Sequence, residues 1–241
     1  MTDTITPTDF SPRSHRKLRF VIVNSFTLAS LALGLLSVIL STAGMLTEAA
    51  ICLLGSVLLD GCDGNLARHW RCTSPFGAQL DSMADMTAFG VATALLAYYW
   101  VMEKEPSWTI LVMVVSGLVA LMSAIRLARF NVSPSNASYF QGIPTTGAAC
   151  IIAITYLTSP HLAPIWVLVL VGFVALLMVS FFPYMKLAQA RRLPLWLYIT
   201  AIVSAVINLP ITILMVATAY ICSGPILWIR QKRESKSERE A

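Results

Sequence analysis

Long apolar stretches separated by short polar breaks dominate the pattern along this chain. A helix needs about 20 apolar residues to cross the hydrocarbon core of a membrane. Eight stretches of roughly that size follow one another, at 20–43, 46–66, 80–102, 107–127, 143–159, 163–183, 194–208 and 211–229. Prolines with polar or charged neighbours interrupt the pattern between several of them. The pattern therefore predicts an all-α, polytopic transmembrane bundle with about eight spans.

The last two stretches have an alternative interpretation as one helix. From 194 to 229, such a helix would be about 54 Å long at about 1.5 Å per residue. The apolar core of a bilayer is only about 30 Å thick. Two short helices on either side of Pro210 fit this thickness better, which favours eight spans over seven.

The basic residues predict how these spans are oriented. If the N-terminus lies in the cytoplasm, all but one of the 17 lysines and arginines fall on the inner side of an eight-span chain. The exception is Lys104, which stands between two glutamates. The positive-inside rule therefore predicts that both termini are cytoplasmic. The chain then divides into a juxtamembrane segment at 1–19, a transmembrane domain at 20–229 and a basic cytoplasmic tail at 230–241.

Composition narrows the classes of protein further. Hydrophobic residues make up 57% of the chain and charged residues 12%, whereas soluble domains carry about 25% charged residues. This excludes a water-soluble globule, and the abundance of apolar residues excludes a disordered chain. The net charge of +5 follows from the membrane topology, and we expect no nucleic acid as a partner.

Four aspartates stand out at the cytoplasmic ends of the second and third spans: Asp60, Asp63, Asp81 and Asp85. Spacings of i, i+3 and i, i+4 place each pair on one helix face, and the short connection makes the two helices antiparallel neighbours. We therefore expect the four carboxylates to converge. Their burial and mutual repulsion are costly, and a hard divalent cation with oxygen ligands offsets that cost. Two such metals about 3.5–4 Å apart would suit phosphoryl transfer.

Two other interpretations of these acids are open. They can be helix-end carboxylates that face water, or the ion site of a cation transporter. A transporter site lies near the middle of the membrane, often at broken helices, whereas these acids gather at one membrane face. Gly64 and Arg68 lie beside them. A small residue allows close approach, and an arginine can grip phosphate oxygens with two hydrogen bonds.

A family resemblance rests on these residues. The run from Asp60 to Arg68, Asp-Gly-Cys-Asp-Gly-Asn-Leu-Ala-Arg, is followed at 77–85 by Gly-Ala-Gln-Leu-Asp-Ser-Met-Ala-Asp. Together they resemble the CDP-alcohol phosphatidyltransferase signature, D-x-x-D-G-x-x-A-R and then G-x-x-x-D-x-x-x-D, at every fixed position. The resemblance implies a membrane enzyme with a six-helix core, commonly a homodimer. Such enzymes join an alcohol to the β-phosphorus of a CDP-lipid and release CMP.

The resemblance also implies roles for individual residues. Asp60, Asp63 and Asp81 would bind Mg²⁺ or Mn²⁺, as two ions, and Asp85 would accept the alcohol's proton and also touch metal. The residues implied for binding CDP-diacylglycerol are Gly64, Ala67, Arg68, Ser74 and Gly77, with Asn24 and Thr27 from an N-x-x-T motif in the first span.

A narrower resemblance concerns the acceptor alcohol. The segments at 80–92, 126–131 and 140–144 are similar to the phosphatidylserine synthase branch, which implies L-serine as acceptor. Arg126, Arg129 and Asn131 are then candidates for binding it, although the two arginines can also be positive-inside anchors or donor-phosphate ligands. Inositol phosphate, glycerol phosphate and choline are the alternative acceptors. We expect the protein in the cell (inner) membrane, with its active site facing the cytoplasm.

Overall fold

The computed structural model describes residues 13–70, 72, 74–132, 140–180 and 183–184. Its elements are α1 (Arg13–Thr42), α2 (Leu46–His69), α3 (Pro75–Asp85), η1 (Met86–Val91), α4 (Ala92–Met102), η2 (Pro106–Trp108), α5 (Thr109–Val132), β1 (Phe140–Gln141), α6 (Thr145–Thr158), α7 (Pro164–Val179) and β2 (Pro183–Tyr184). Apart from the two-residue strands, the regular structure of this part is helical, which confirms the predicted helical class.

Four continuous helices are long and apolar enough to cross a membrane: Leu18–Thr42, Leu46–His69, Pro75–Met102 and Pro106–Val132. They correspond to the first four predicted spans, and the shorter α6 and α7 to the fifth and sixth. The predicted spans at 194–208 and 211–229 lie outside the described residues, as do both chain ends. The third helix begins at Pro75 rather than at 80, because Ser74 caps its N-terminus and Pro75 occupies its first turn.

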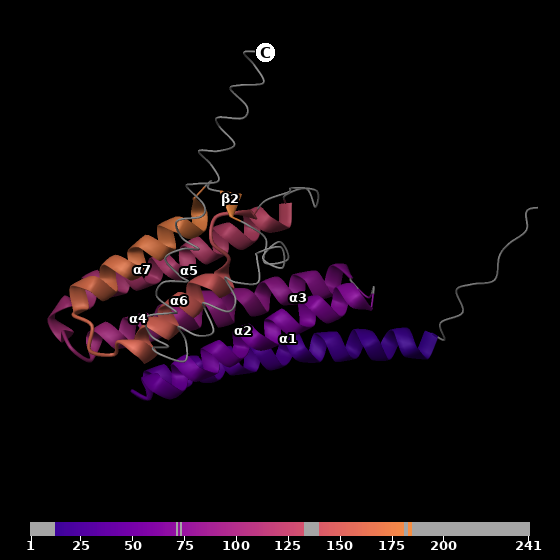
Figure 1. The fold of residues 1–241 in the computed structure, drawn as a ribbon, viewed down its shortest axis with the longest axis horizontal. Coiled ribbons are helices and arrows are strands. Elements are labelled where there is room, and N and C mark those ends of the chain that lie inside the picture. The colour runs from indigo at the N-terminus through magenta and orange to yellow at the C-terminus, as the bar shows by residue number, and fades with distance from the viewer. Residues whose placement is uncertain (1–12, 71, 73, 133–139, 181–182, 185–241) are drawn as a thin grey trace, which may run out of the picture.

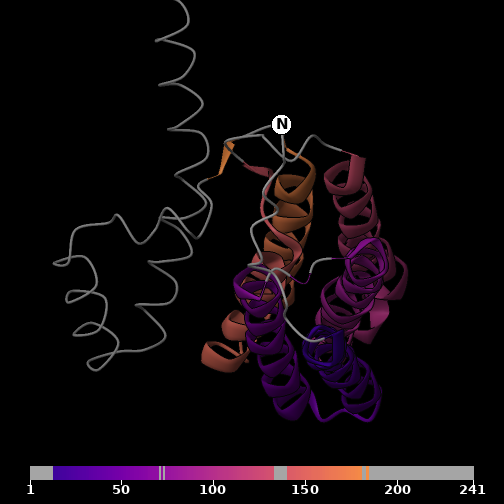
Figure 2. The same ribbon diagram turned by 90° about the vertical axis from the view of Figure 1, so that its right-hand side faces the viewer.

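The helices lie side by side along the long axis of the molecule (Figure 1), and the view along that axis shows them gathered into a bundle (Figure 2). α1 packs along α2, α5 along α7, and α2 against α6. The turn between α1 and α2 forms at Gly44, whose φ of 78° suits glycine. There Met45 N–H donates to Leu40 O at 2.9 Å, which closes the end of α1.

Small and hydroxyl-bearing residues set the packing between these helices. Ser30 of α1 and Ser56 of α2 are buried and each donates to the other's backbone carbonyl, at 2.9 and 2.8 Å. A Cβ placed on Gly34 of α1 would lie 2.5 Å from the Cβ of Ala88. Close contact through small residues, reinforced by hydroxyl hydrogen bonds, is how helices associate in a membrane.

The third long helix changes pitch immediately after Asp85. Residues Met86–Val91 form a π-helical turn, in which Ala92 N–H donates to the carbonyl of Thr87, five residues earlier. Such a turn accommodates one extra residue within an α-helix. A regular helix would rotate Trp100 about 100° away from the face of Asp81. By the same ideal geometry, the one extra residue of the π turn would offset that rotation.

Candidate active site

The structure brings the four aspartates together at the end of α2 and along α3, as their helical spacing predicts. One carboxylate oxygen from each of Asp60, Asp63 and Asp81 lies within 4.8 Å of the other two. The carboxyl group of Asp85 lies within hydrogen-bonding reach of Asp60. We call these four residues the acidic cluster.

The acidic cluster fits a hard divalent cation. All of its donor atoms are carboxylate oxygens, which Mg²⁺ and Mn²⁺ prefer as ligands. Asp63 is only 3% exposed, and charged groups gathered this closely at low exposure repel one another. A cation among Asp60, Asp63 and Asp81 would remove that repulsion.

α1 supplies hydrogen-bonding groups to one side of the acidic cluster. The buried Thr27 donates from Oγ1 to Oδ2 of Asp63 at 2.7 Å. Asn24 lies one turn earlier, and a Cβ built on Gly77 would be 3.4 Å from its Oδ1 and 3.2 Å from Oγ of Ser74. Ser74 in turn accepts from Gly77 N–H at 3.0 Å. These contacts bring together four of the residues predicted to bind the nucleotide-linked lipid: Asn24, Thr27, Ser74 and Gly77.

The remaining predicted donor-binding residues lie on the last turns of α2. Arg68 is exposed, and its Nη2 donates to Oδ1 of Asn65 at 3.0 Å. A Cβ on Gly64 would stand 3.9 Å from that same Nη2. The half-buried Ala67 accepts a backbone hydrogen bond from Cys72 at 3.1 Å. The guanidinium therefore lies beside Gly64, and the connection to α3 folds back against the end of α2.

The three predicted acceptor-binding residues on α5 point to different neighbours. Arg126 is buried, at 9% exposure, and acts electrostatically on the Asp85 carboxylate. Asn131 exchanges hydrogen bonds with Ser82 of α3 at 3.1 and 3.2 Å. Arg129 instead donates from Nη1 to the carbonyl of Val179, the last residue of α7, at 3.1 Å. Arg126 and Asn131 therefore meet the helix of Asp81 and Asp85, and Arg129 meets α7.

Two features beside the acidic cluster are not apparent from the sequence. Ser82 is one ordinary polar residue among several, and only its contact with Asn131 shows that it joins α3 to α5. The π turn has a weak signal in Gly90, a glycine within a helix. A Cβ there would lie 3.1 Å from the Cβ of Ser123, so α5 approaches this turn closely.

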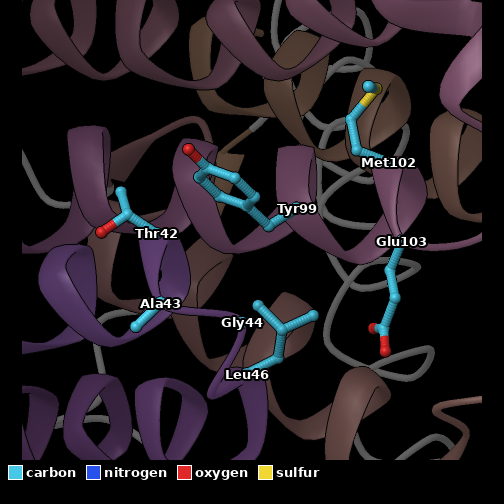
Figure 3. A pocket seen from close by; sticks show the side chains of 7 residues that line it. All are labelled: Thr42, Ala43, Gly44, Leu46, Tyr99, Met102 and Glu103. Carbon is cyan, nitrogen blue, oxygen red and sulfur yellow. The ribbon is translucent and has the colours of Figure 1, made fainter.

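A hollow of about 420 Å³ lies at the other end of the bundle, beside the turn from α1 to α2 (Figure 3). Its lining residues are Thr42, Ala43, Gly44, Leu46, Tyr99, Met102 and Glu103. The Tyr99 hydroxyl and the Glu103 carboxylate point away from each other in this view. Because its polar groups do not converge, this hollow lacks the features of a reactive site.

Residues 20–227 match the model of the family described as CDP-alcohol phosphatidyltransferase. The chain belongs to this family. It is accordingly an integral membrane protein. The family generally depends on metal, which agrees with the cluster of carboxylates in this chain.

Several curated proteins are similar to the chain over most of its length. A CDP-diacylglycerol–serine O-phosphatidyltransferase of Helicobacter pylori strain J99 is 33% identical over 87% of this chain and 92% of its own. A protein of the same name from Methanocaldococcus jannaschii is 29% identical over 90% of this chain and 98% of its own. An archaetidylserine synthase of Methanothermobacter thermautotrophicus is 37% identical over 52% of this chain and 53% of its own.

Proposed function

We propose that the chain transfers the phosphatidyl group of CDP-diacylglycerol to the hydroxyl of L-serine, which gives phosphatidylserine and CMP. The observation that carries this proposal is the convergence of Asp60, Asp63 and Asp81 within 4.8 Å, with Asp85 adjoining them, in a chain of the CDP-alcohol phosphatidyltransferase family. Serine as the acceptor is supported by the similarity to proteins of Helicobacter pylori and Methanocaldococcus jannaschii that are named as CDP-diacylglycerol–serine O-phosphatidyltransferases.

Asp60, Asp63 and Asp81 would hold Mg²⁺ or Mn²⁺, with Asp85 at the edge of the same site, and two ions match the number of carboxylates. Such ions would supply positive charge to neutralise the diphosphate of the donor and the departing CMP. Thr27 holds one oxygen of Asp63 in place through its 2.7 Å hydrogen bond. The orientation of that carboxylate is therefore set by α1.

The donor headgroup is assigned to the surface shared by α1, the end of α2 and the start of α3. Gly64, Ala67 and Gly77 leave room for it, because small side chains let a ligand approach the backbone closely. Asn24 and Ser74 offer polar contacts, and Arg68 can grip phosphate oxygens with two parallel hydrogen bonds. The acyl chains of the donor remain in the bilayer.

Asp85 is proposed as the general base. The serine hydroxyl attacks the β-phosphorus of CDP-diacylglycerol and forms a new P–O bond, while the bond between this phosphorus and the oxygen of CMP breaks. The hydroxyl proton passes to the Asp85 carboxylate, and CMP leaves with the electron pair of the broken bond. Asp85 lies one helical turn after Asp81 and so borders the site formed by Asp60, Asp63 and Asp81.

The acceptor is assigned to the end of α5, where Arg126, Arg129 and Asn131 lie. Serine carries a carboxylate, which an arginine binds with charge-assisted hydrogen bonds. Arg126 is suited to this because it is buried near Asp85. A site built around the carboxylate should reject ethanolamine strongly, since ethanolamine would leave the buried arginine without its partner.

An acceptor panel tests this function. Purified protein receives CDP-diacylglycerol and Mg²⁺ or Mn²⁺, and CMP release is measured with L-serine, ethanolamine, choline, glycerol phosphate and inositol phosphate. We expect release with L-serine and little with ethanolamine. Release that responds only to a phosphorylated alcohol would retain the family chemistry and refute the serine assignment. The Asp85→Asn variant serves as the background control.

The membrane arrangement is a separate proposal. Eight spans with both termini in the cytoplasm, a juxtamembrane segment at 1–19 and a tail at 230–241 place the acidic cluster at the cytoplasmic face of the cell membrane. Single cysteines near residues 5 and 236, in a chain without native cysteines, should resist impermeant thiol reagents in intact cells. Labelling at 236 alone would indicate an odd number of spans. We also propose a homodimer, which sedimentation in detergent would detect.

A further inference from the structure

The C-terminal end of α7 is held by groups from two other segments. The last carbonyls of a helix lack the N–H partner four residues on that interior carbonyls have. Ser180, just beyond α7, donates to the Leu177 carbonyl from its N–H at 3.3 Å and from Oγ at 2.8 Å. The Leu177 carbonyl accepts from the backbone N–H of Ile143 at 3.2 Å. The Val179 carbonyl accepts from Nη1 of Arg129 at 3.1 Å. A cation at this end is also favoured by the helix dipole. α5 and the segment before α6 therefore both dock onto the final turn of α7.

Gly142 shows how closely this segment approaches. Its φ is 77°, a left-handed conformation that favours glycine. A Cβ built there would overlap the backbone carbonyl oxygen of Met178. On the same segment, Phe140 pairs with Tyr184 and Gln141 with Pro183 in a short antiparallel ladder. The segment before α6 and the segment after α7 are thus paired through their backbones next to the last turn of α7.

Arg126 lies one helical turn before Arg129 on α5. Its side chain is buried and acts on Asp85, and Asn131 beyond it bonds Ser82 of α3. The end of α5 therefore lies between α3, which carries two of the aspartates, and the docked end of α7. A shift of α5 relative to α7 would move Arg126 relative to Asp85.

We propose that Arg129 and Gly142 are positioning residues that dock α5 onto the C-terminal turn of α7 and so set the place of Arg126 relative to α3. This inference rests on the proposed function and narrows its acceptor site. Arg126 meets the acceptor's carboxylate, whereas Arg129 acts through the protein backbone. Gly142 contributes to the same dock without carrying any charge.

That difference in charge provides the test. Arg129→Gln removes the side chain of α5 that makes the dock. Gly142→Ala disrupts the dock from the segment before α6 and leaves every arginine unsubstituted. Both variants should lower kcat by a similar factor, about tenfold to a hundredfold. Both should also raise the KM for serine to the same extent as each other and by less than Arg126→Ala does, because they displace Arg126 without removing it. Arg126→Ala should instead raise the KM for serine by about tenfold or more, because it removes a charge-assisted contact to the substrate.

Arg129→Lys keeps a cation that can still donate to the Val179 carbonyl, so it should restore most of the lost kcat. A readout without turnover accompanies the kinetics: both dock variants should accelerate proteolysis near 140–144, and Arg126→Ala should not. A large rise in the serine KM that is specific to Arg129→Gln, with Gly142→Ala unaffected, would overturn the inference. If the wild-type protein prefers another acceptor, the proposed function fails, but the same comparison with that acceptor still tests the dock.

Discussion

The two ends of the helix bundle hold charged side chains in opposite kinds of environment. At the end formed by the turns after α4 and α6, Lys104 donates to the backbone carbonyls of Pro160 and, at 2.9 Å, of Leu162. Its ammonium also lies 5.8 Å from the centre of the buried Trp100 ring. Burial lowers the pKa of Lys104, and Glu103 acts in the opposite direction. At the other end, the acidic cluster gathers four carboxylates, and the buried Arg126 acts electrostatically on Asp85.

The difference separates a structural charge from a set of functional ones. Lys104 finds acceptors within the protein and ties two turns together, with Trp100 Nε1 donating to the same Pro160 carbonyl at 3.0 Å. The acidic cluster brings like charges together, which by itself costs stability. A bound ligand of opposite charge would offset that cost. We therefore expect substitutions at the acidic end to affect turnover and those at the Lys104 end to affect stability.

Removing divalent cations should have the largest effect. We expect excess chelator to abolish CMP release and added Mg²⁺ or Mn²⁺ to restore it, because a divalent cation would offset the repulsion among these carboxylates. Asp60→Asn and Asp81→Asn should each weaken metal binding, measured by the metal concentration that gives half-maximal rate. Glu48 is an exposed acid in the first turn of α2. Glu48→Gln is therefore the matched control and should leave the metal concentration at half-maximal rate unchanged. Full activity in chelator would refute the contrast between the two ends.

The second effect concerns proton transfer. Asp85→Asn should lower kcat by about 10²–10⁴-fold, the usual contribution of a general base, while binding of CDP-diacylglycerol is largely retained. Single-turnover CMP release and donor binding, measured on the same preparation, separate the two quantities. Turnover close to that of the original protein would show that another group accepts the proton.

A smaller loss is expected from Thr27→Val, which removes the 2.7 Å hydrogen bond to Asp63 and keeps the shape of the side chain. A hydrogen bond to a charged group contributes about 1.5–3 kcal/mol, so the apparent metal affinity should fall roughly tenfold or more. Thr27→Ser retains the hydroxyl and serves as the control. Equal metal affinity in the Val and Ser variants would mean that Thr27 does not orient Asp63.

The smallest effect on catalysis should come from Lys104→Met. The lost bonds to Pro160 and Leu162 should destabilise the fold by about 1–3 kcal/mol, seen as a lower midpoint of thermal unfolding in detergent. At temperatures where the variant is folded, kcat and both KM values should stay within about twofold of the original. Lys104→Arg should preserve most of the stability. A selective loss of turnover without a change in unfolding would contradict the structural role.

Much of the fold and of the site could be predicted from local patterns. Apolar stretches located the first six helices, since spanning length is a property of the chain alone. The i, i+3 and i, i+4 spacings of the aspartates predicted that they converge, and the structure brings Asp60, Asp63 and Asp81 within 4.8 Å. The same reasoning paired Arg126 with Arg129 on one helix face. It could not show that a third helix, α7, lies close enough to take Arg129.

Hydropathy and residue spacing within single helices are sufficient to predict the membrane class, the order of the helices and the acidic pairs. Contacts between residues far apart along the chain are known only from the folded bundle. Thr27 reaches Asp63, Asn131 reaches Ser82, and Gly142 lies against Met178. Each of these contacts depends on how two helices or segments are rotated and shifted against each other. That choice is made by packing over the whole bundle, which no single segment of the sequence encodes.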